Sequence, residues 1–259
     1  MDYLVRLHKF RKLRLPQCNA RRLLAVLMLF SLSQTGLAYN FTPTDMEFMA
    51  SSEICKEALA DKTPNLDLAR IYKAKGQRSG WGRLIWQVGG WHYCGGAIKL
   101  NRAKRLPSGK ARDTLLEQVV NNTNYSYSRI AKTNTWAADM AFTLAMAYEE
   151  MGEVDKAMEV LQEIEKYHPD NPAIKTAYGL IYYAQNEYDQ ALKEFAAANE
   201  FSKGENAEIV YFLGLTAYKS GNLELAEQCA TKAEALGYPL PGLKRLLSEA
   251  PISEAPTQH

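Results

Sequence analysis

Three side chains in this sequence have the types and spacing that could support chemistry: Cys55, His92 and Cys94. His92 and Cys94 are two positions apart, so they could begin a metal site with Cys55 or act as a thiol nucleophile and its base. A structural zinc site needs four ligands, and the sequence places no fourth ligand beside them. In an oxidising compartment the two cysteines would pair instead, which removes the thiolate. We therefore predict a Cys55–Cys94 disulfide and interpret His92 as a packed helix residue.

Other catalytic patterns are missing from the sequence. It has no glycine-rich phosphate loop, no Cys-x-x-Cys and no Gly-x-Ser-x-Gly. Glu149 and Glu150 are neighbours, but such a pair at an exposed helix end is usually solvated. Cys229 is most simply a small packing residue. We therefore expect a non-enzymatic protein without cofactor or metal, and a metal- or thiol-dependent enzyme remains the alternative.

The first 38 residues have the pattern of a signal peptide. Seven basic residues lead into a short apolar core from Leu23 to Leu32, and Gly36-Leu37-Ala38 supplies the small residues that a signal peptidase reads. The apolar run is short for a membrane span. We expect a cleaved signal and an exported, periplasmic protein, with an uncleaved inner-membrane anchor as the alternative.

The charge of the remaining chain is unevenly distributed. Residues 39–137 contain 15 basic and 8 acidic residues, whereas residues 138–259 contain 9 basic and 20 acidic residues. Such an asymmetry suggests either different roles for the two parts or mutual attraction between them.

The basic part holds a segment rich in tryptophan and glycine. Arg70–Arg112 has 11 basic residues and no acidic one, and Trp81, Trp86 and Trp91 are five positions apart. One interpretation is a tightly packed helix whose tryptophans fill the core. The other is a surface for an anionic polysaccharide or anionic lipid, while nucleic acid is not expected. The residues proposed for this second surface are Trp81, Arg83, Trp86, Trp91, Arg102 and Arg105.

Residues 39–137 are predicted to form a helical module. Thr44 and Glu47 make a capping box that opens a helix through Leu59, and Asn65 can cap a second helix that stops at Gly76. The polar stretch 121–128 fits either a helix or a loop. We expect helical hairpins here that lead into the acidic part of the chain.

One pattern of small and large apolar residues is written three times between 138 and 238. The alanines Ala157, Ala191 and Ala226 are separated by 34 and 35 residues, a period typical of a two-helix repeat. Small residues are needed where two helix backbones approach closely, and Gly179 and Gly214 supply them on the first helices. Gly152 and Asn186 stand where the turn between helices needs a left-handed residue.

These three copies resemble the tetratricopeptide repeat (TPR), with Pro169 closing the first copy and Lys203 replacing that proline in the second. The resemblance implies an all-α superhelical array over residues 138–238, followed by a capping helix and a tail in 239–259. It also implies a concave groove lined by the first helix of each repeat. Carried over to this sequence, the lining is Phe142, Met146, Glu149, Glu150, Thr176, Leu180, Tyr183, Glu208, Tyr211, Leu215 and Tyr218.

This lining is aromatic and acidic, and it lacks the lysines and asparagines with which chaperone-binding relatives hold a terminal carboxylate. We expect a protein partner that offers an extended or helical segment with apolar anchors and basic flanks. The alternative is that the aromatic side chains of this lining pack against the chain's own segment 81–112, whose charge is complementary. The sequence thus predicts an exported scaffold or adaptor of the cell envelope, and binding of an anionic polymer or membrane surface through residues 70–112 is the alternative.

Overall fold

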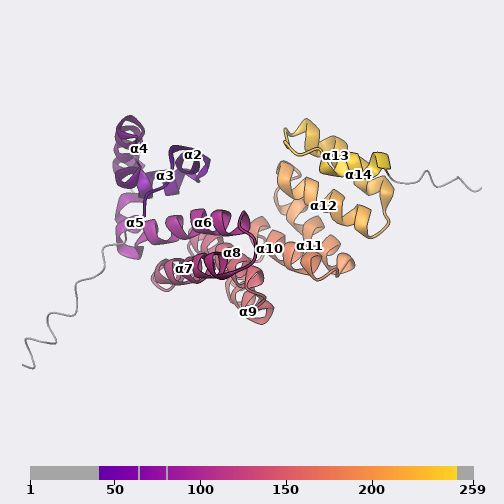
Figure 1. The fold of residues 1–259 in the computed structure, drawn as a ribbon, viewed down its shortest axis with the longest axis horizontal. Coiled ribbons are helices and arrows are strands. Elements are labelled where there is room, and N and C mark those ends of the chain that lie inside the picture. Colours follow the sequence, from indigo (N-terminus) through magenta and orange to yellow (C-terminus); the bar gives the residue numbers. More distant parts are fainter. Residues whose placement is uncertain (1–40, 64, 80, 250–259) are drawn as a thin grey trace, which may run out of the picture. The chain divides into compact units, whose positions relative to one another are not determined.

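The computed structural model describes residues 41–63, 65–79 and 81–249, which lie in one compact unit that begins at Phe41. The predicted signal peptide and the tail 250–259 lie outside the described residues. The described chain is built from helices, which confirms the predicted all-α class (Figure 1). The amino-terminal helices are α2 (Asp45–Ala50), α3 (Glu53–Leu59), the 3-10 turn η1 (Ala60–Lys62), α4 (Leu66–Ser79), α5 (Trp81–Val88), α6 (Gly90–Lys104) and α7 (Lys110–Tyr127). The carboxy-terminal helices are α8 (Thr135–Glu150), α9 (Val154–Glu165), α10 (Pro172–Ala184), α11 (Tyr188–Phe201), α12 (Ala207–Lys219), α13 (Leu223–Ala235) and α14 (Gly242–Glu249).

The first predicted helix is broken into two. Its capping box is present, since the Thr44 hydroxyl accepts from the Glu47 backbone N–H and the Glu47 carboxylate accepts from the Thr44 N–H. The prediction of one helix through Leu59 is wrong, because Ser51 and Ser52 adopt extended backbone between α2 and α3. Serine favours such a break since its side chain competes for backbone hydrogen bonds, and the Ser51 hydroxyl donates to the Glu47 carbonyl.

The tryptophan- and glycine-rich segment is also two helices rather than one. Gly89 has a φ of 62° and separates α5 from α6. A β-carbon at Gly89 would lie 2.5 Å from the Tyr125 ring, so this position needs glycine both for its left-handed backbone and for space.

Helices α6 and α7 form a hairpin that packs on α8 (Figure 1). A β-carbon at Gly96 would lie 2.7 Å from the Thr123 hydroxyl, so glycine permits the close approach of the two helices. The polar stretch 121–128, for which the sequence left two interpretations, is helical as far as Tyr127. The Tyr127 hydroxyl donates to the Glu163 carboxylate at 3.1 Å, which connects α7 to α9.

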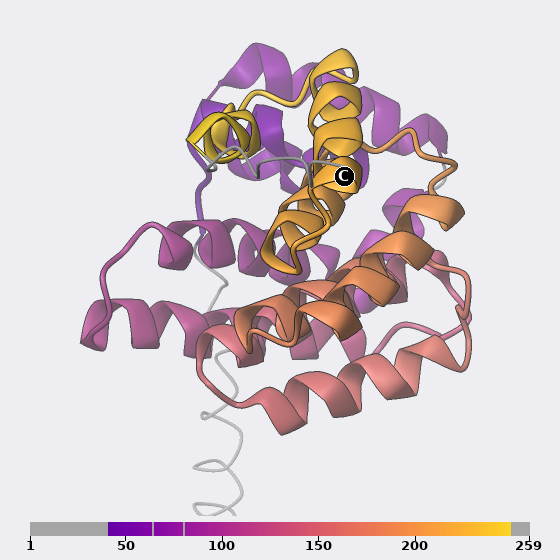
Figure 2. The same ribbon diagram turned by 90° about the vertical axis from the view of Figure 1, so that its right-hand side faces the viewer.

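Within residues 135–235, α8–α9, α10–α11 and α12–α13 form three successive hairpins, seen from another side in Figure 2. Their turns use left-handed residues at equivalent places: Gly152 at 75°, Asn186 at 63° and Gly221 at 84°. The side chains of Asn171 and Asn206 cap α10 and α12 by accepting from backbone N–H groups. The predicted helix-turn-helix repeat is therefore confirmed in its local chemistry.

Small residues lie where the hairpin helices cross. Ala157, Ala191 and Ala226 have no accessible surface. A β-carbon at Gly179 would lie 2.9 Å from the Phe195 ring, and one at Gly214 would lie 2.6 Å from the Cys229 β-carbon. Any larger side chain would push the helices apart.

The array ends in α14, where Leu243 is buried against Ala217, Ala226 and Ala230. Repeat arrays need such a cap to cover the last apolar face. Among the residues described, none of the helices combines the length and the apolar character that crossing a membrane requires.

Candidate interaction surfaces

The residues predicted to line a groove lie on α8, α10 and α12, the first helices of the three hairpins. Those that keep partial access to solvent are Phe142, Glu149, Glu150, Leu180, Tyr183, Tyr211, Leu215 and Tyr218, and Glu208 is exposed. Met146 and Thr176 are buried, and the Thr176 hydroxyl donates to the Pro172 carbonyl at 2.7 Å. These two side chains stabilise the array from inside and do not present themselves to solvent.

We call the predicted lining residues on α8, α10 and α12 the row. Its acidic end, at Glu149 and Glu150, faces the chain's own basic segment. The Glu150 carboxylate forms ion pairs with Arg112 of α7 and with Lys104 of α6, whose Nζ is 3.9 Å away. Burial and the negative charge of Glu150 raise the pKa of Glu149. Glu150 is therefore a point where the basic and acidic parts of the chain meet, through ion pairs and not through the aromatic side chains of the lining.

The aromatic end of the row packs against the repeats themselves rather than against segment 81–112. Tyr211 stacks on Tyr238, which follows α13, with ring centroids 4.2 Å apart. Tyr183 of α10 meets Tyr188 of α11 edge to face at 5.5 Å. Tyr211 therefore helps to hold the segment that leads into the carboxy-terminal cap, whereas Tyr183 contacts its own hairpin.

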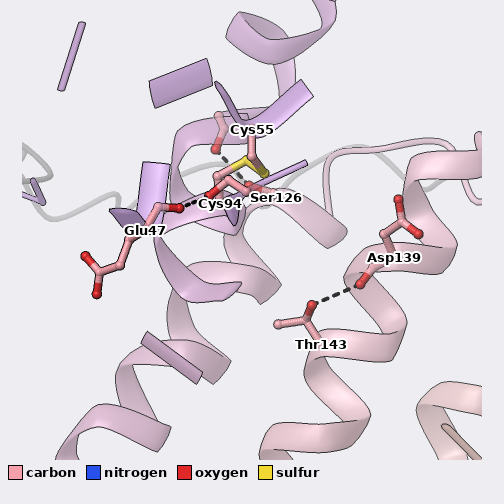
Figure 3. Close-up of a disulfide and its surroundings, with 8 residues drawn as sticks. Glu47, Cys55, Cys94, Ser126, Asp139 and Thr143 are labelled. Carbon is pink, nitrogen blue, oxygen red and sulfur yellow. Dashed lines mark hydrogen bonds between the residues drawn. A yellow bond between two sulfur atoms is a disulfide. The ribbon is translucent and has the colours of Figure 1, made fainter. Parts of the chain in front are cut away.

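Helix α3 is fastened to α6 by a covalent link, and helix α2 by an ionic link. The Cys55 and Cys94 sulfurs are bonded to each other and join α3 to α6, with Cα atoms 5.3 Å apart (Figure 3). On α2, Glu47 pairs with Arg102 of α6 at 2.6 Å. The two links border a cavity of about 520 Å³ between α2, α3 and α6, which Arg105 and Tyr93 also line.

A second hollow, of about 370 Å³, lies between α3, α4 and the start of α8. Its lining includes Ile54, Lys75, Trp136 and Asp139. Figure 3 shows Asp139, whose backbone carbonyl accepts from the Thr143 hydroxyl at 3.0 Å. Asp139 precedes Phe142 by about one turn of α8. This hollow is therefore the place where the amino-terminal helices approach the row.

The predicted tryptophan-rich surface is divided by the structure. Arg102 is engaged with Glu47 and with the Phe41 ring, and Arg105 lines the cavity beside the disulfide. Arg83, Trp86 and Trp91 belong to a different surface, and the side chain of Trp81 lies outside the described part. The Trp86 and Trp91 rings meet edge to face at 5.0 Å. The six residues thus do not form one surface.

Two residues that lie beside Trp91 and His92, Tyr125 and Arg129, were not predicted from the sequence as part of a surface. Tyr125, near the end of α7, lies 4.2 Å from the His92 ring, and the Arg129 guanidinium lies 3.7 Å above the Tyr125 ring. Tyr125 belongs to the polar stretch that fitted a loop as well as a helix, and Arg129 follows it. A sequence signal for their role was absent, because it depends on the packing of α7 against α6.

The cysteines and histidines that could have supported catalysis or metal binding make structural contacts instead. Cys94 is bound to Cys55, and His92 stacks on Tyr125 while burial lowers the pKa of its imidazole. The His168 Nε2 lies 2.7 Å from the Lys132 carbonyl. Burial raises the pKa of the Cys229 thiol, which makes it less reactive. Among the described residues, no three acidic, histidine or cysteine side chains are grouped as metal ligands would be.

Comparison with known proteins agrees with this geometry. Residues 142–205 match the family model of the tetratricopeptide repeat, which covers most of the first two hairpins. Neither the curated proteins nor the solved structures contain a match to this chain. The hairpin geometry and the family match together support tetratricopeptide-like repeats in this all-α chain, and repeats of this kind suggest binding to other proteins.

Proposed function

We propose that this protein is a non-enzymatic adaptor of the cell envelope that holds a segment of a partner protein against α8, α10 and α12. The observation that carries the proposal is the row of half-buried apolar and aromatic side chains on these first helices. Its members besides Tyr211 are Phe142, Leu180, Tyr183, Leu215 and Tyr218.

The composition of the row indicates the kind of segment that fits. Half-buried aromatic and aliphatic side chains can gain further burial when an apolar side chain of a partner docks on them. The exposed acidic residues Asp139 and Glu208 lie at the start of α8 and α12. Basic residues that flank the apolar anchors of the partner would be attracted to these carboxylates.

The proposed cellular setting is supported by the sequence. The basic lead, short apolar core and small residues of 1–38 support export, and the Cys55–Cys94 pair is compatible with an oxidising compartment. We place the protein in the periplasm after cleavage of the signal. Sequencing the amino terminus of protein purified from the envelope fraction tests this placement, and a mature protein that still carries Met1 would contradict it.

The test of the adaptor function is an affinity capture from the envelope of the native host with residues 39–259 as bait. The groove variant carries Phe142→Ala and Tyr183→Ala, which remove side-chain surface without touching the stack of Tyr211 on Tyr238. The matched control is Tyr167→Ala, because Tyr167 is 49% exposed and lies past the end of α9. A partner captured by the wild type and the control but not by the groove variant supports the proposal. A partner captured equally by all three proteins, or no partner at all, would overturn it.

A further inference from the structure

A strip of aromatic side chains crosses three helices at the amino-terminal end of the described unit. Trp86 of α5 meets Trp91 of α6 at 5.0 Å, Trp91 lies 5.9 Å from His92, and His92 lies 4.2 Å from Tyr125 of α7. The Arg129 guanidinium covers the Tyr125 ring at 3.7 Å. We call these five residues the aromatic strip.

The strip is built into the fold and does not need a partner to form. Gly89 turns the chain between α5 and α6, and its carbonyl accepts a hydrogen bond from the Ser126 hydroxyl of α7 at 2.8 Å. Arg129 is held by donation to the Tyr125 carbonyl at 2.6 Å. A surface organised in this way loses little conformational entropy when it binds.

The outermost side chain of the strip is Trp86, which is 74% exposed, and Tyr125 is 40% exposed. A single exposed hydrophobic residue is ordinary, but Trp86 continues into the rings of Trp91, His92 and Tyr125, which makes the apolar surface contiguous. Trp136 shows the contrast, because it is 3% exposed and packs edge to face on Tyr93. The exposure of Trp86 therefore marks a binding surface rather than an unfilled core.

The sequence that carries the strip, residues 81–129, is rich in basic and poor in acidic residues. Arg83 is exposed on α5, and Arg129 is exposed at the end of the strip. Between Asp67 and Asp139 the sequence has only two carboxylates, Asp113 and Glu117, and both lie in the first half of α7. Glu117 is eight residues before Tyr125, about 12 Å along the helix. The strip therefore favours an anionic partner.

The geometry of the rings distinguishes among anionic partners. Stacking on successive sugar rings or bases needs several open aromatic faces in similar orientation, but the Trp86 and Trp91 planes are inclined by 68° and Arg129 covers a face of Tyr125. Tryptophan, tyrosine and arginine mixed on one surface are instead suited to a membrane interface, where rings enter the headgroup region and guanidinium groups meet phosphates.

The exposed Trp86 ring and the exposed Arg83 and Arg129 side chains supply the two kinds of contact that such an interface offers. We propose that the aromatic strip docks this protein on an anionic phospholipid surface, with Trp86 as the inserted anchor and Arg83 and Arg129 at the lipid phosphates.

The proposal is tested with residues 39–259 and sedimenting vesicles of phosphatidylcholine, with and without phosphatidylglycerol. We expect binding to the vesicles that contain phosphatidylglycerol and weaker binding at high salt. Trp86→Ser should lower the partition coefficient about tenfold, since the anchor loses its buried apolar surface. Arg83→Gln should lower it about fivefold, the effect of one basic residue near an anionic surface.

Two control variants show whether vesicle binding depends on the strip itself. Tyr167→Ser removes a similarly exposed aromatic side chain outside the strip and should leave vesicle binding unchanged. Phe142→Ala changes the row on α8, so vesicle binding that survives it is independent of the proposed adaptor function. The proposal fails if the wild type ignores anionic vesicles, if Trp86→Ser binds them as the wild type does, or if the strip binds an acidic polysaccharide but no vesicle.

Discussion

Arg102 of α6 holds the carboxylate of Glu47 with two nitrogens, Nε at 2.7 Å and Nη2 at 2.6 Å. The same carboxylate caps α2 by accepting from the Thr44 N–H. The Glu47 side chain thus both caps the start of α2 and fastens α2 to α6. The sequence predicts the cap, but the ion pair spans 55 positions and follows from the tertiary structure.

The Glu47–Arg102 pair should make stability depend on pH. The Arg102 guanidinium lowers the pKa of Glu47 from 4.5 to about 2. Since the folded-state pKa is depressed, the pair contributes fully above pH 4.5, and its contribution is lost as the pH falls toward 2. Glu47→Gln should cost about 1–2 kcal/mol at pH 7, allowing for solvent screening.

Urea unfolding of the wild type and Glu47→Gln at pH 7, 4 and 2.5 measures this difference. Glu117→Gln, an exposed position on α7, is the matched control and should change little at any pH. A gap between the wild type and Glu47→Gln that stays constant from pH 7 to 2.5 would contradict the assigned role of the pair.

Reduction of the Cys55–Cys94 pair should destabilise the protein. The two cysteines are 39 positions apart, and for a loop of that length the chain-entropy model gives about 4 kcal/mol. We expect a lower melting temperature in reductant and in the Cys55→Ser, Cys94→Ser double variant. Thiol titration of unfolded, unreduced residues 39–259 should find Cys229 alone. Three titratable thiols, or a melting temperature that ignores reductant, would disprove the disulfide.

Ala191→Trp should break the cooperativity of the repeats. Ala191 has no accessible surface and packs with Phe195 and Val210 between α11 and its neighbours. A tryptophan there cannot fit without separating the helices, which costs more than the typical loss of about 1–3 kcal/mol from milder overpacking. Thermal unfolding followed by circular dichroism is the measurement, and Gln190→Trp at the adjacent exposed position is the control. A sharp, unshifted transition for Ala191→Trp would refute the helix pairing.

Arg112 and Glu150 should show coupling in a double-mutant cycle. Their side chains are each 19% exposed, so water screens the pair less than a surface pair. Arg112→Glu and Glu150→Arg should each destabilise the protein by about 1–2 kcal/mol, because each places two like charges together. The swapped double variant should recover much of that loss in urea unfolding. Strictly additive losses would show that the two charges do not interact.

The sequence by itself determined the fold of residues 135–249 and much of its local detail. Helical periodicity, the small residues at Ala157, Ala191 and Ala226 and the left-handed turns at Gly152 and Asn186 act between positions close in the chain. Such local constraints can be read from spacing and residue type. The same holds for the capping box at Thr44 and for the separation of basic and acidic residues.

Only the tertiary structure decided which side chains are available for binding. Met146 and Phe142 share a helix and a predicted role, yet Met146 is buried and Phe142 is partly accessible. Arg102 pairs with Glu47, whereas Arg83 stays exposed, and Trp86 joins Tyr125 in one strip through a kink at Gly89. Exposure is the sum of contacts with residues far away in the sequence, so residue type and spacing cannot supply it.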